Sequence, residues 1–164
     1  MTKHQGKLRG TARSKAEKMI GRIIMEGGSV VPVGSRCIKY AFHKDSDWDF
    51  LVSPLTYIQW ELEKNSFEKG GSEIKGAKKS DFSSMKYTDK TTGQTVNFIV
   101  ANTQDFYDNF IAAQTICECS SVKDKQDRVA VFDFINGNRY IKDEEFAYIV
   151  EHGESNNDYD TVPF

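Results

Sequence analysis

The chain has 164 residues, of which 38% are hydrophobic, and its formal net charge at pH 7 is -2. This length suits a single domain with one core, and the 11 Phe and 7 Tyr residues exclude an intrinsically disordered chain. The small net charge indicates no particular partner, and no apolar run reaches the length of a membrane-spanning helix.

The N-terminal part of the sequence predicts a lead-in followed by a helix. Residues 1–13 are expected to be flexible and basic. A helix is predicted over residues 14–26, because Ser14 and Glu17 have the spacing of a capping box and apolar side chains then recur every three or four positions. The pair Gly27-Gly28 is expected to end this helix.

Two short strands and a turn follow. Strand patterns are found at Val30–Val33 and at Trp48–Val52. Between them, Gly34-Ser35 turns the chain and Arg36–Phe42 is predicted to form a short helix. Proline suits a first helical turn, so another helix is predicted over residues 54–64.

The second half of the sequence predicts a hairpin and two more helices. The expected elements are a loop with a short strand near Ile74 over residues 68–80, strands over 82–88 and 94–100, and helices over 104–119 and 125–135. Thr103 is the expected N-cap of the first of these helices. No internal repeat or linker is found, which predicts one α+β domain over residues 14–152 and an acidic tail over residues 153–164.

The two ends of the chain carry opposite charge. Residues 1–22 contain seven basic side chains against one acidic side chain, and residues 142–164 contain one lysine against seven acidic side chains. One interpretation is a basic arm that makes weak contact with nucleic acid and an acidic tail that screens it. The other interpretation is two solvated ends that attract each other weakly.

The cysteines and the N-terminus indicate a cellular compartment. Cys37, Cys117 and Cys119 are too few for a disulfide framework and lack the spacing of a zinc site. The basic N-terminus has no hydrophobic region behind it, so no secretory signal is expected. Reduced thiols and a cytoplasmic location are therefore predicted.

A glycine-serine turn and two aspartates are residue types suited to bind the phosphates and the metal ion of a nucleoside triphosphate. Gly34 lets the backbone come close to a phosphate, and Ser35 adds a hydroxyl before a predicted helix. Asp47 and Asp49 flank Trp48 on a predicted strand, so both carboxylates project to the same side and Trp48 points into the core. Two such carboxylates are suitable ligands for Mg²⁺ or Mn²⁺.

The segment Val33-Gly34-Ser35, followed by Asp47-Trp48-Asp49-Phe50, resembles the signature of the DNA polymerase β-like nucleotidyltransferase superfamily. The resemblance covers roughly residues 14–100. It implies a nucleotidyltransferase-type fold with a small mixed sheet and flanking helices. It also implies metal-dependent transfer of a nucleoside monophosphate, from ATP or another nucleoside triphosphate, to a hydroxyl of RNA, protein or a small molecule. Small phage-encoded proteins look similar through the hairpin and the next helix, which would place this chain in the host cytoplasm.

In that superfamily a later strand supplies a third carboxylate to the catalytic metal, and the matching position here is Asn97. An amide oxygen can ligate a metal, but it has no charge and accepts a proton poorly. Asp81 and Asp105 are the nearest alternative acids in the sequence. Two hypotheses stay open. One is an enzyme with Asp47, Asp49 and Asn97 as catalytic residues, and the other is a degenerate module that binds nucleotide, nucleic acid or a protein without turnover.

Two basic residues complete the predicted nucleotide site. Arg36 and Lys39 follow the turn closely and are expected, with Gly34 and Ser35, to contact the nucleotide. The alternative is that both side chains only solvate the surface, as basic side chains often do.

Overall fold

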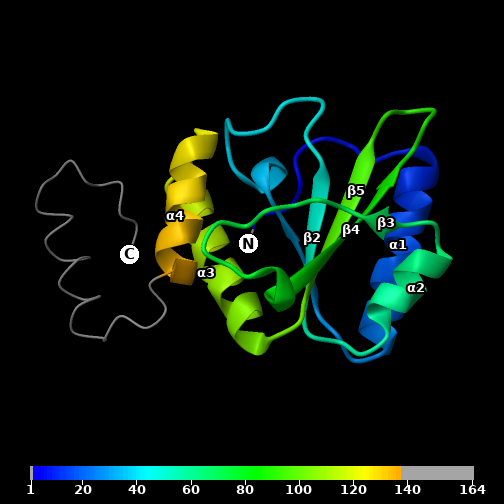
Figure 1. Ribbon diagram of the computed structural model, residues 1–164. Helices are drawn as coiled ribbons and strands as arrows, with labels where there is room; N and C mark the ends of the chain where they lie inside the picture. Colours follow the sequence, from blue (N-terminus) through cyan, green and yellow to red (C-terminus); the bar gives the residue numbers. More distant parts are fainter. Residues whose placement is uncertain (1, 138–164) are drawn as a thin grey trace, which may run out of the picture.

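A five-stranded mixed sheet forms the centre of the protein in the computed structural model, which describes residues 2–137 (Figure 1). The strands lie in the order β1-β2-β5-β4-β3, and β2 and β5 are parallel while the other neighbours are antiparallel. Their bounds are β1 Val30–Val33, β2 Trp48–Val52, β3 Glu68–Lys69, β4 Phe82–Thr88 and β5 Thr95–Ala101. The predicted α+β class, with a small mixed sheet and flanking helices, is confirmed.

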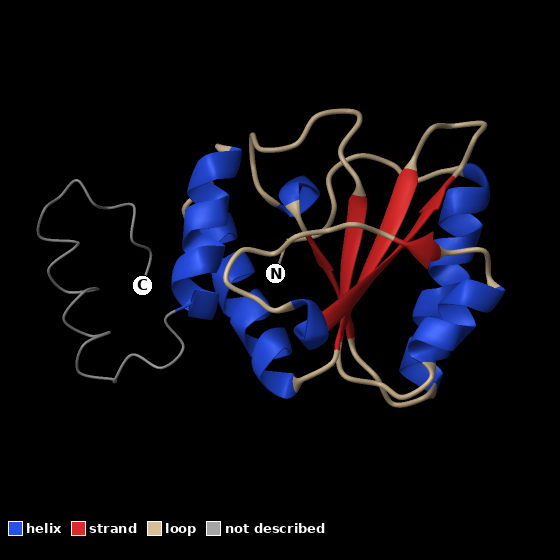
Figure 2. Cartoon of the chain, in the orientation of Figure 1, coloured by secondary structure: helices blue, strands red, loops and turns tan. Residues whose placement is uncertain are grey.

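Helices cover both faces of the sheet (Figures 1 and 2). The α-helices of the described residues are α1 Gly10–Met25, α2 Ile58–Lys64, α3 Gln104–Cys119 and α4 Lys125–Gly137, and the 3-10 turns are η1 Ser35–Cys37 and η2 Lys79–Asp81. Helices α1 and α2 lie on one face, and α3 and α4 lie on the other. Within residues 2–137, none of these helices combines the length and apolar character needed to cross a membrane.

The alternation of side chains along the strands divides the core into two layers. In the first layer, Phe50 and Phe98 pack with the apolar face of α1. In the second layer, Leu51 and Ile99 pack with Phe106 and other residues of α3. Residues two positions before Leu51 and Ile99 therefore also point to the α3 side of the sheet.

Helix α1 begins earlier than predicted. It starts at Gly10, and Ser14 lies inside it and donates its hydroxyl to the Gly10 carbonyl at 3.3 Å. The cap comes from the turn between β4 and β5, because Asp89 Oδ2 accepts from the N–H groups of Thr11 and Ala12 at 3.1 and 3.3 Å. The predicted capping box at Ser14 is wrong because this distant carboxylate satisfies the first turn instead.

The segment before α1, expected to be a flexible lead-in, contacts the fold. His4 Nε2 lies 2.8 Å from the Asp49 carbonyl and 3.1 Å from the Val33 carbonyl, at the end of the β1–β2 ladder. The N–H of Gln5 donates to the Arg36 carbonyl at 2.8 Å. The domain therefore includes residues that were predicted to lie outside it. The predicted domain end at residue 152 and the acidic tail over 153–164 lie outside the described residues.

Other local predictions are corrected in the loops. The helix predicted over Arg36–Phe42 is limited to Ser35–Cys37, because Ile38 adopts an extended conformation and buries its side chain. Helix α2 starts only after Tyr57, which has a positive φ of 69°. No strand forms near Ile74 in the described chain; this side chain packs against the second core layer from a loop.

Candidate functional site

Asp49 and Asn97 lie side by side on the parallel strands β2 and β5. The Asn97 amide donates from Nδ2 to Asp49 Oδ1 at 3.0 Å. Both side chains point to the α3 side of the sheet, since they are two positions before Leu51 and Ile99. Two predicted site residues are thus brought together by the sheet itself.

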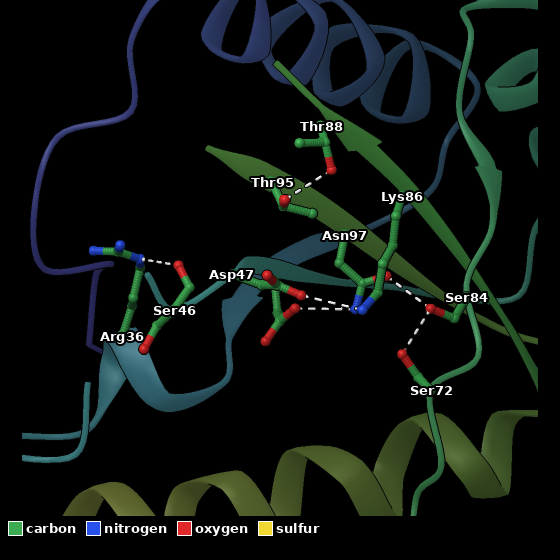
Figure 3. Close-up of polar contacts among 10 residues, drawn as sticks. Arg36, Ser46, Asp47, Ser72, Ser84, Lys86, Thr88, Thr95 and Asn97 are labelled. Atoms are coloured by element: carbon green, nitrogen blue, oxygen red, sulfur yellow. Dashed lines mark hydrogen bonds and ion pairs between the residues drawn. The ribbon is translucent and has the colours of Figure 1, made fainter. Parts of the chain in front are cut away.

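Asp47 and Lys86 complete a polar group beside this pair. Lys86 Nζ lies 3.1 Å from Asp47 Oδ2, and each side chain is about one third exposed, at 35% and 34%. Lys86 is on β4, directly opposite Asn97 in the antiparallel register. We call Asp47, Asp49, Lys86 and Asn97 the carboxylate cluster; Figure 3 shows Asp47, Lys86 and Asn97 converging.

Both polar atoms of the Asn97 side-chain amide are hydrogen-bonded. Its Oδ1 accepts from Ser84 Oγ at 2.8 Å, and Ser84 Oγ in turn lies 2.9 Å from Ser72 Oγ (Figure 3). Asn97 is 3% exposed. In this arrangement Asn97 presents its donor, and not its oxygen, to Asp49. Its Nδ2 therefore faces Asp49 and its Oδ1 faces Ser84.

The environment of Asp49 disfavours its negative charge. Burial raises the pKa of Asp49 to about 6, and the nearby Asp47 carboxylate adds to this effect. The hydrogen bond from Asn97 and the positive charges of Lys86 and Arg36 oppose the rise in pKa. A cation that approaches Asp49 therefore stabilises its negative charge.

Gly34 lies against Asp49 and is hydrogen-bonded to α3. It has a positive φ of 87°, and a Cβ at this position would collide with Oδ2 of Asp49. Its N–H donates to Gln114 Oε1 at 3.0 Å, and its carbonyl accepts from Gln114 Nε2 at 3.1 Å. The glycine thus permits close approach to Asp49, and its own N–H is occupied rather than open to a phosphate.

Gln114 is a residue that the sequence reasoning missed. It is 1% exposed on α3, and its amide also donates to Glu118 Oε2 at 3.0 Å. The sequence did contain a signal for this residue. Gln114 lies four positions after the buried Phe110, which makes it a polar residue on the apolar face of a helix. Such a residue is expected to have a buried polar partner, which here is the backbone of Gly34.

Arg36 supports the loop that leads to Asp47 and is 3% exposed. Its guanidinium donates to the carbonyls of Ser46, Gln5 and Lys44 at 2.9, 2.9 and 3.0 Å. It also stacks on Trp48, with Cζ 3.9 Å from the ring centroid. These contacts give Arg36 a structural role, and its predicted contact with a nucleotide stays a prediction.

The other predicted residues near the turn have different exposures. Ser35 begins η1 and is half-buried, while Lys39 is exposed with Nζ 5.0 Å from the ring centroid of Tyr40. Trp48 is 3% exposed, which confirms its predicted place in the core. Lys39 does not line the pocket that contains Asp47 and Asp49.

A pocket of about 270 Å³ lies between the carboxylate cluster and α4. Its basic lining residues are Lys75, Lys86, Lys125 and Arg128, and its acidic lining residues are Asp47, Asp49 and Glu73. Ile99, Phe110 and Phe132 form an apolar part of the wall. The basic residues of α4 were missed because they lie far along the chain from the glycine-serine turn. The pocket combines features suited to an anion with an apolar surface.

The residues of the cluster fit a metal that is shared with a substrate. Asp47 and Asp49 supply the oxygen ligands that Mg²⁺ and Mn²⁺ prefer. Within residues 2–137, no group of three or more His, Cys, Asp or Glu side chains is arranged to hold a metal ion. Neither Asp81 nor Asp105 lines the pocket. Because Mg²⁺ commonly takes one or two carboxylates plus substrate phosphates, this donor set suits an ion bound together with a triphosphate.

The basic N-terminal region is partly used inside the fold. Arg22 pairs with Glu61 at 2.9 Å, Lys15 donates to the Asn65 carbonyl at 2.8 Å, and Arg13 pairs with Glu17 at 3.2 Å. Part of the charge of residues 1–22 is therefore directed to the protein itself, and contact of this segment with nucleic acid stays a prediction.

Comparisons with known proteins assign no family to the chain. No protein-family model and no curated protein matches its sequence. It is similar in structure to the conserved protein GrpB from Enterococcus faecalis, with a TM-score of 0.47 and 15% identity, covering 80% of this chain and 93% of that one. It is also similar to the polymerase core of TRAMP, an RNA surveillance complex, with a TM-score of 0.37 and 14% identity, covering 90% of this chain and 46% of that one.

Proposed function

We propose that the chain is a metal-dependent nucleotidyltransferase that moves a nucleoside monophosphate from a nucleoside triphosphate to a hydroxyl acceptor. The observation that carries the proposal is the joint placement of Asp47 and Asp49 with basic and apolar side chains around one pocket. Phosphates require positive charge, and a base or ribose can pack against the apolar wall formed in part by Phe110 and Phe132. No single predicted motif supplies this combination by itself.

Five residues that line the pocket have a role in the proposal. Asp47 and Asp49 hold Mg²⁺ or Mn²⁺, and the bound ion neutralises charge on the transferred phosphate and the leaving pyrophosphate. Lys125 and Arg128 of α4 contact the phosphates from the other side of the pocket. Asn97 keeps Asp49 in place through its amide.

A second candidate is a module of the same type that binds a nucleotide without turnover. The specific observation in its favour is the direction of the Asn97 hydrogen bond, because an amide that donates to Asp49 neither ligates a metal nor accepts a proton from an acceptor hydroxyl. Nucleotide binding is common to both candidates, and only the transfer step separates them.

The test is incubation of the full chain with α-labelled nucleoside triphosphates, Mg²⁺ or Mn²⁺, and RNA, protein or small hydroxyl acceptors. Transfer is expected, with loss of product in Asp47→Asn and Asp49→Asn. Asp105→Asn is the matched control, because Asp105 is exposed on α3 outside the pocket. Metal-dependent triphosphate binding without product, measured by calorimetry, supports the second candidate. Absence of both binding and product rejects both candidates.

A further inference from the structure

The ammonium of Lys86 is the part of the carboxylate cluster that the proposed function does not use. It is held 3.1 Å from Asp47 Oδ2, and its side chain is 35% exposed in the wall of the pocket. Its position is fixed by strand pairing, since Lys86 is opposite Asn97 on the neighbouring strand. A positive charge therefore stands beside the two carboxylates that are proposed to hold a metal.

The positive charge of Lys86 weakens the attraction of the carboxylate cluster for a free divalent ion. The ammonium of Lys86 offsets the charge of Asp47, and Asn97 already donates to Asp49 at 3.0 Å without adding negative charge. Within the carboxylate cluster, a metal that approaches alone therefore meets one carboxylate, Asp49, that forms no ion pair with a residue of 2–137, and a lysine that repels it. Mg²⁺ gives up its water reluctantly, so such a site binds it weakly.

We propose that Lys86 is a counter-ion to Asp47 that is displaced when a triphosphate enters, so that metal and nucleotide bind together and the metal alone binds weakly. The proposal rests on the proposed function, because it needs a polyphosphate in the pocket. The phosphates offer Lys86 an alternative partner of higher negative charge. The flexible stem of lysine lets Nζ leave Asp47 for a phosphate oxygen, which frees the carboxylate.

A purely structural ion pair makes a different prediction. Ion pairs with this degree of exposure contribute little to the stability of the fold. If Lys86 stayed on Asp47 whatever entered the pocket, a triphosphate would raise Mn²⁺ affinity equally in the unaltered chain and in Lys86→Met. The gain in Mn²⁺ affinity on adding a triphosphate, compared between these two proteins, is therefore the quantity that separates the two roles.

The experiment measures binding of Mn²⁺ alone to the full chain, by paramagnetic resonance of free Mn²⁺ or by calorimetry. Lys86→Met keeps an unbranched side chain and removes the charge, and we expect it to bind Mn²⁺ about tenfold more tightly than the unaltered chain. Lys90→Met is the control, because Lys90 is exposed in the β4–β5 turn and makes the same change in net charge. Adding Asp47→Asn to Lys86→Met should remove the gain. Equal Mn²⁺ affinity in Lys86→Met and the unaltered chain, or a gain that survives Asp47→Asn, overturns the proposal.

A second measurement adds a non-hydrolysable triphosphate. The unaltered chain should then bind Mn²⁺ more tightly, and Lys86→Met should show a smaller increase, because its metal site is already open. Folding is checked by circular dichroism, and Lys86→Gln replaces Lys86→Met if the latter does not fold. Absence of nucleotidyl transfer alone leaves these binding results unaffected. Tight binding of Mn²⁺ alone to the unaltered chain overturns the role of Lys86 and leaves the transferase proposal standing.

Discussion

Asn97 is a hydrogen-bond donor to Asp49, with 3.0 Å between Nδ2 and Oδ1 across the parallel strands β2 and β5. Asn97 stands at the position where the resemblance places a third carboxylate, and its amide holds the Asp49 carboxylate in place. Its oxygen is occupied by Ser84, and that serine lies against Ser72. The site is therefore built around two carboxylates, with an amide and a lysine in the adjoining positions.

Replacing Asn97 by aspartate should convert this donor into a third carboxylate. We expect Asn97→Asp to unfold more easily than the unaltered chain without metal, by about 2 kcal/mol at pH 7, because a buried carboxylate then meets that of Asp49 without the amide proton. Excess Mn²⁺ should recover that stability. Urea denaturation with and without Mn²⁺ measures both effects. Asn102→Asp is the control, since Asn102 is exposed directly after β5, and a similar response to Mn²⁺ in this control would contradict the prediction.

The raised pKa of Asp49 predicts a pH dependence of folding stability. Burial raises this pKa to about 6 from 3.8, so between these pH values the folded chain binds more protons than the unfolded chain. The contribution of Asp49 to stability is therefore full below about pH 4 and is lost as the pH rises through about 6. We expect Asp49→Asn to be more stable than the unaltered chain at pH 7, by on the order of 2 kcal/mol. Urea denaturation at pH 4.5 and pH 7.5 is the measurement, and a difference between the two proteins that does not change with pH would refute the assignment.

The close approach of Gly34 to Asp49 predicts a steric effect at one glycine and not at another. Gly34 and Gly93 both have positive φ, of 87° and 76°, but an added Cβ collides with Asp49 at Gly34 and meets nothing within 4 Å at Gly93. Gly93→Ala should cost about 1 kcal/mol, from backbone strain alone. Gly34→Ala should cost at least about 2 kcal/mol more, because the carboxylate must move. Thermal and urea unfolding of the two variants compare them directly, and equal losses would show that the Asp49 contact is unimportant.

The sequence was informative where structure depends on local patterns. The strands Val30–Val33, Trp48–Val52 and Phe82–Thr88 and the helix Gln104–Cys119 were predicted with the bounds that the structure has. The pairing of Asp47 and Asp49 on one side of a strand followed from the period of two, and both line the same pocket. Thr103 was correctly predicted as an N-cap, since its hydroxyl accepts from the Phe106 N–H at 3.1 Å.

The parts that were not predicted depend on contacts between residues far apart in the chain. Asp89 caps α1 from 77 and 78 positions away, so the start of that helix could not be found from its own residues. Lys86 reaches Asp47 from 39 positions away, and Gln114 reaches Gly34 from 80. The order of the strands and the packing of the helices on the sheet bring these pairs together, and local sequence patterns indicate neither.

Gln114 offers a way to alter the site without touching its carboxylates. Its side-chain amide binds the N–H and the carbonyl of Gly34 at 3.0 and 3.1 Å, and so fixes the turn that lies against Asp49. Gln114→Leu keeps the approximate volume but leaves two backbone groups without partners, which should cost about 1–3 kcal/mol. The release of Gly34 should also weaken Mn²⁺-triphosphate binding, because the place of Asp49 is no longer defined.

The control for this change is Gln104→Leu. Gln104 is on the same helix and bonds only the exposed Asp108, at 2.9 Å, so its loss should change neither stability nor binding appreciably. Urea denaturation and calorimetry with Mn²⁺ and a non-hydrolysable triphosphate measure the two quantities in both variants. A Gln114→Leu protein that is less stable but binds as tightly as the unaltered chain would show that Gln114 supports the fold alone. Reduced binding at a temperature where the variant remains folded would show that α3 helps to position the metal ligand.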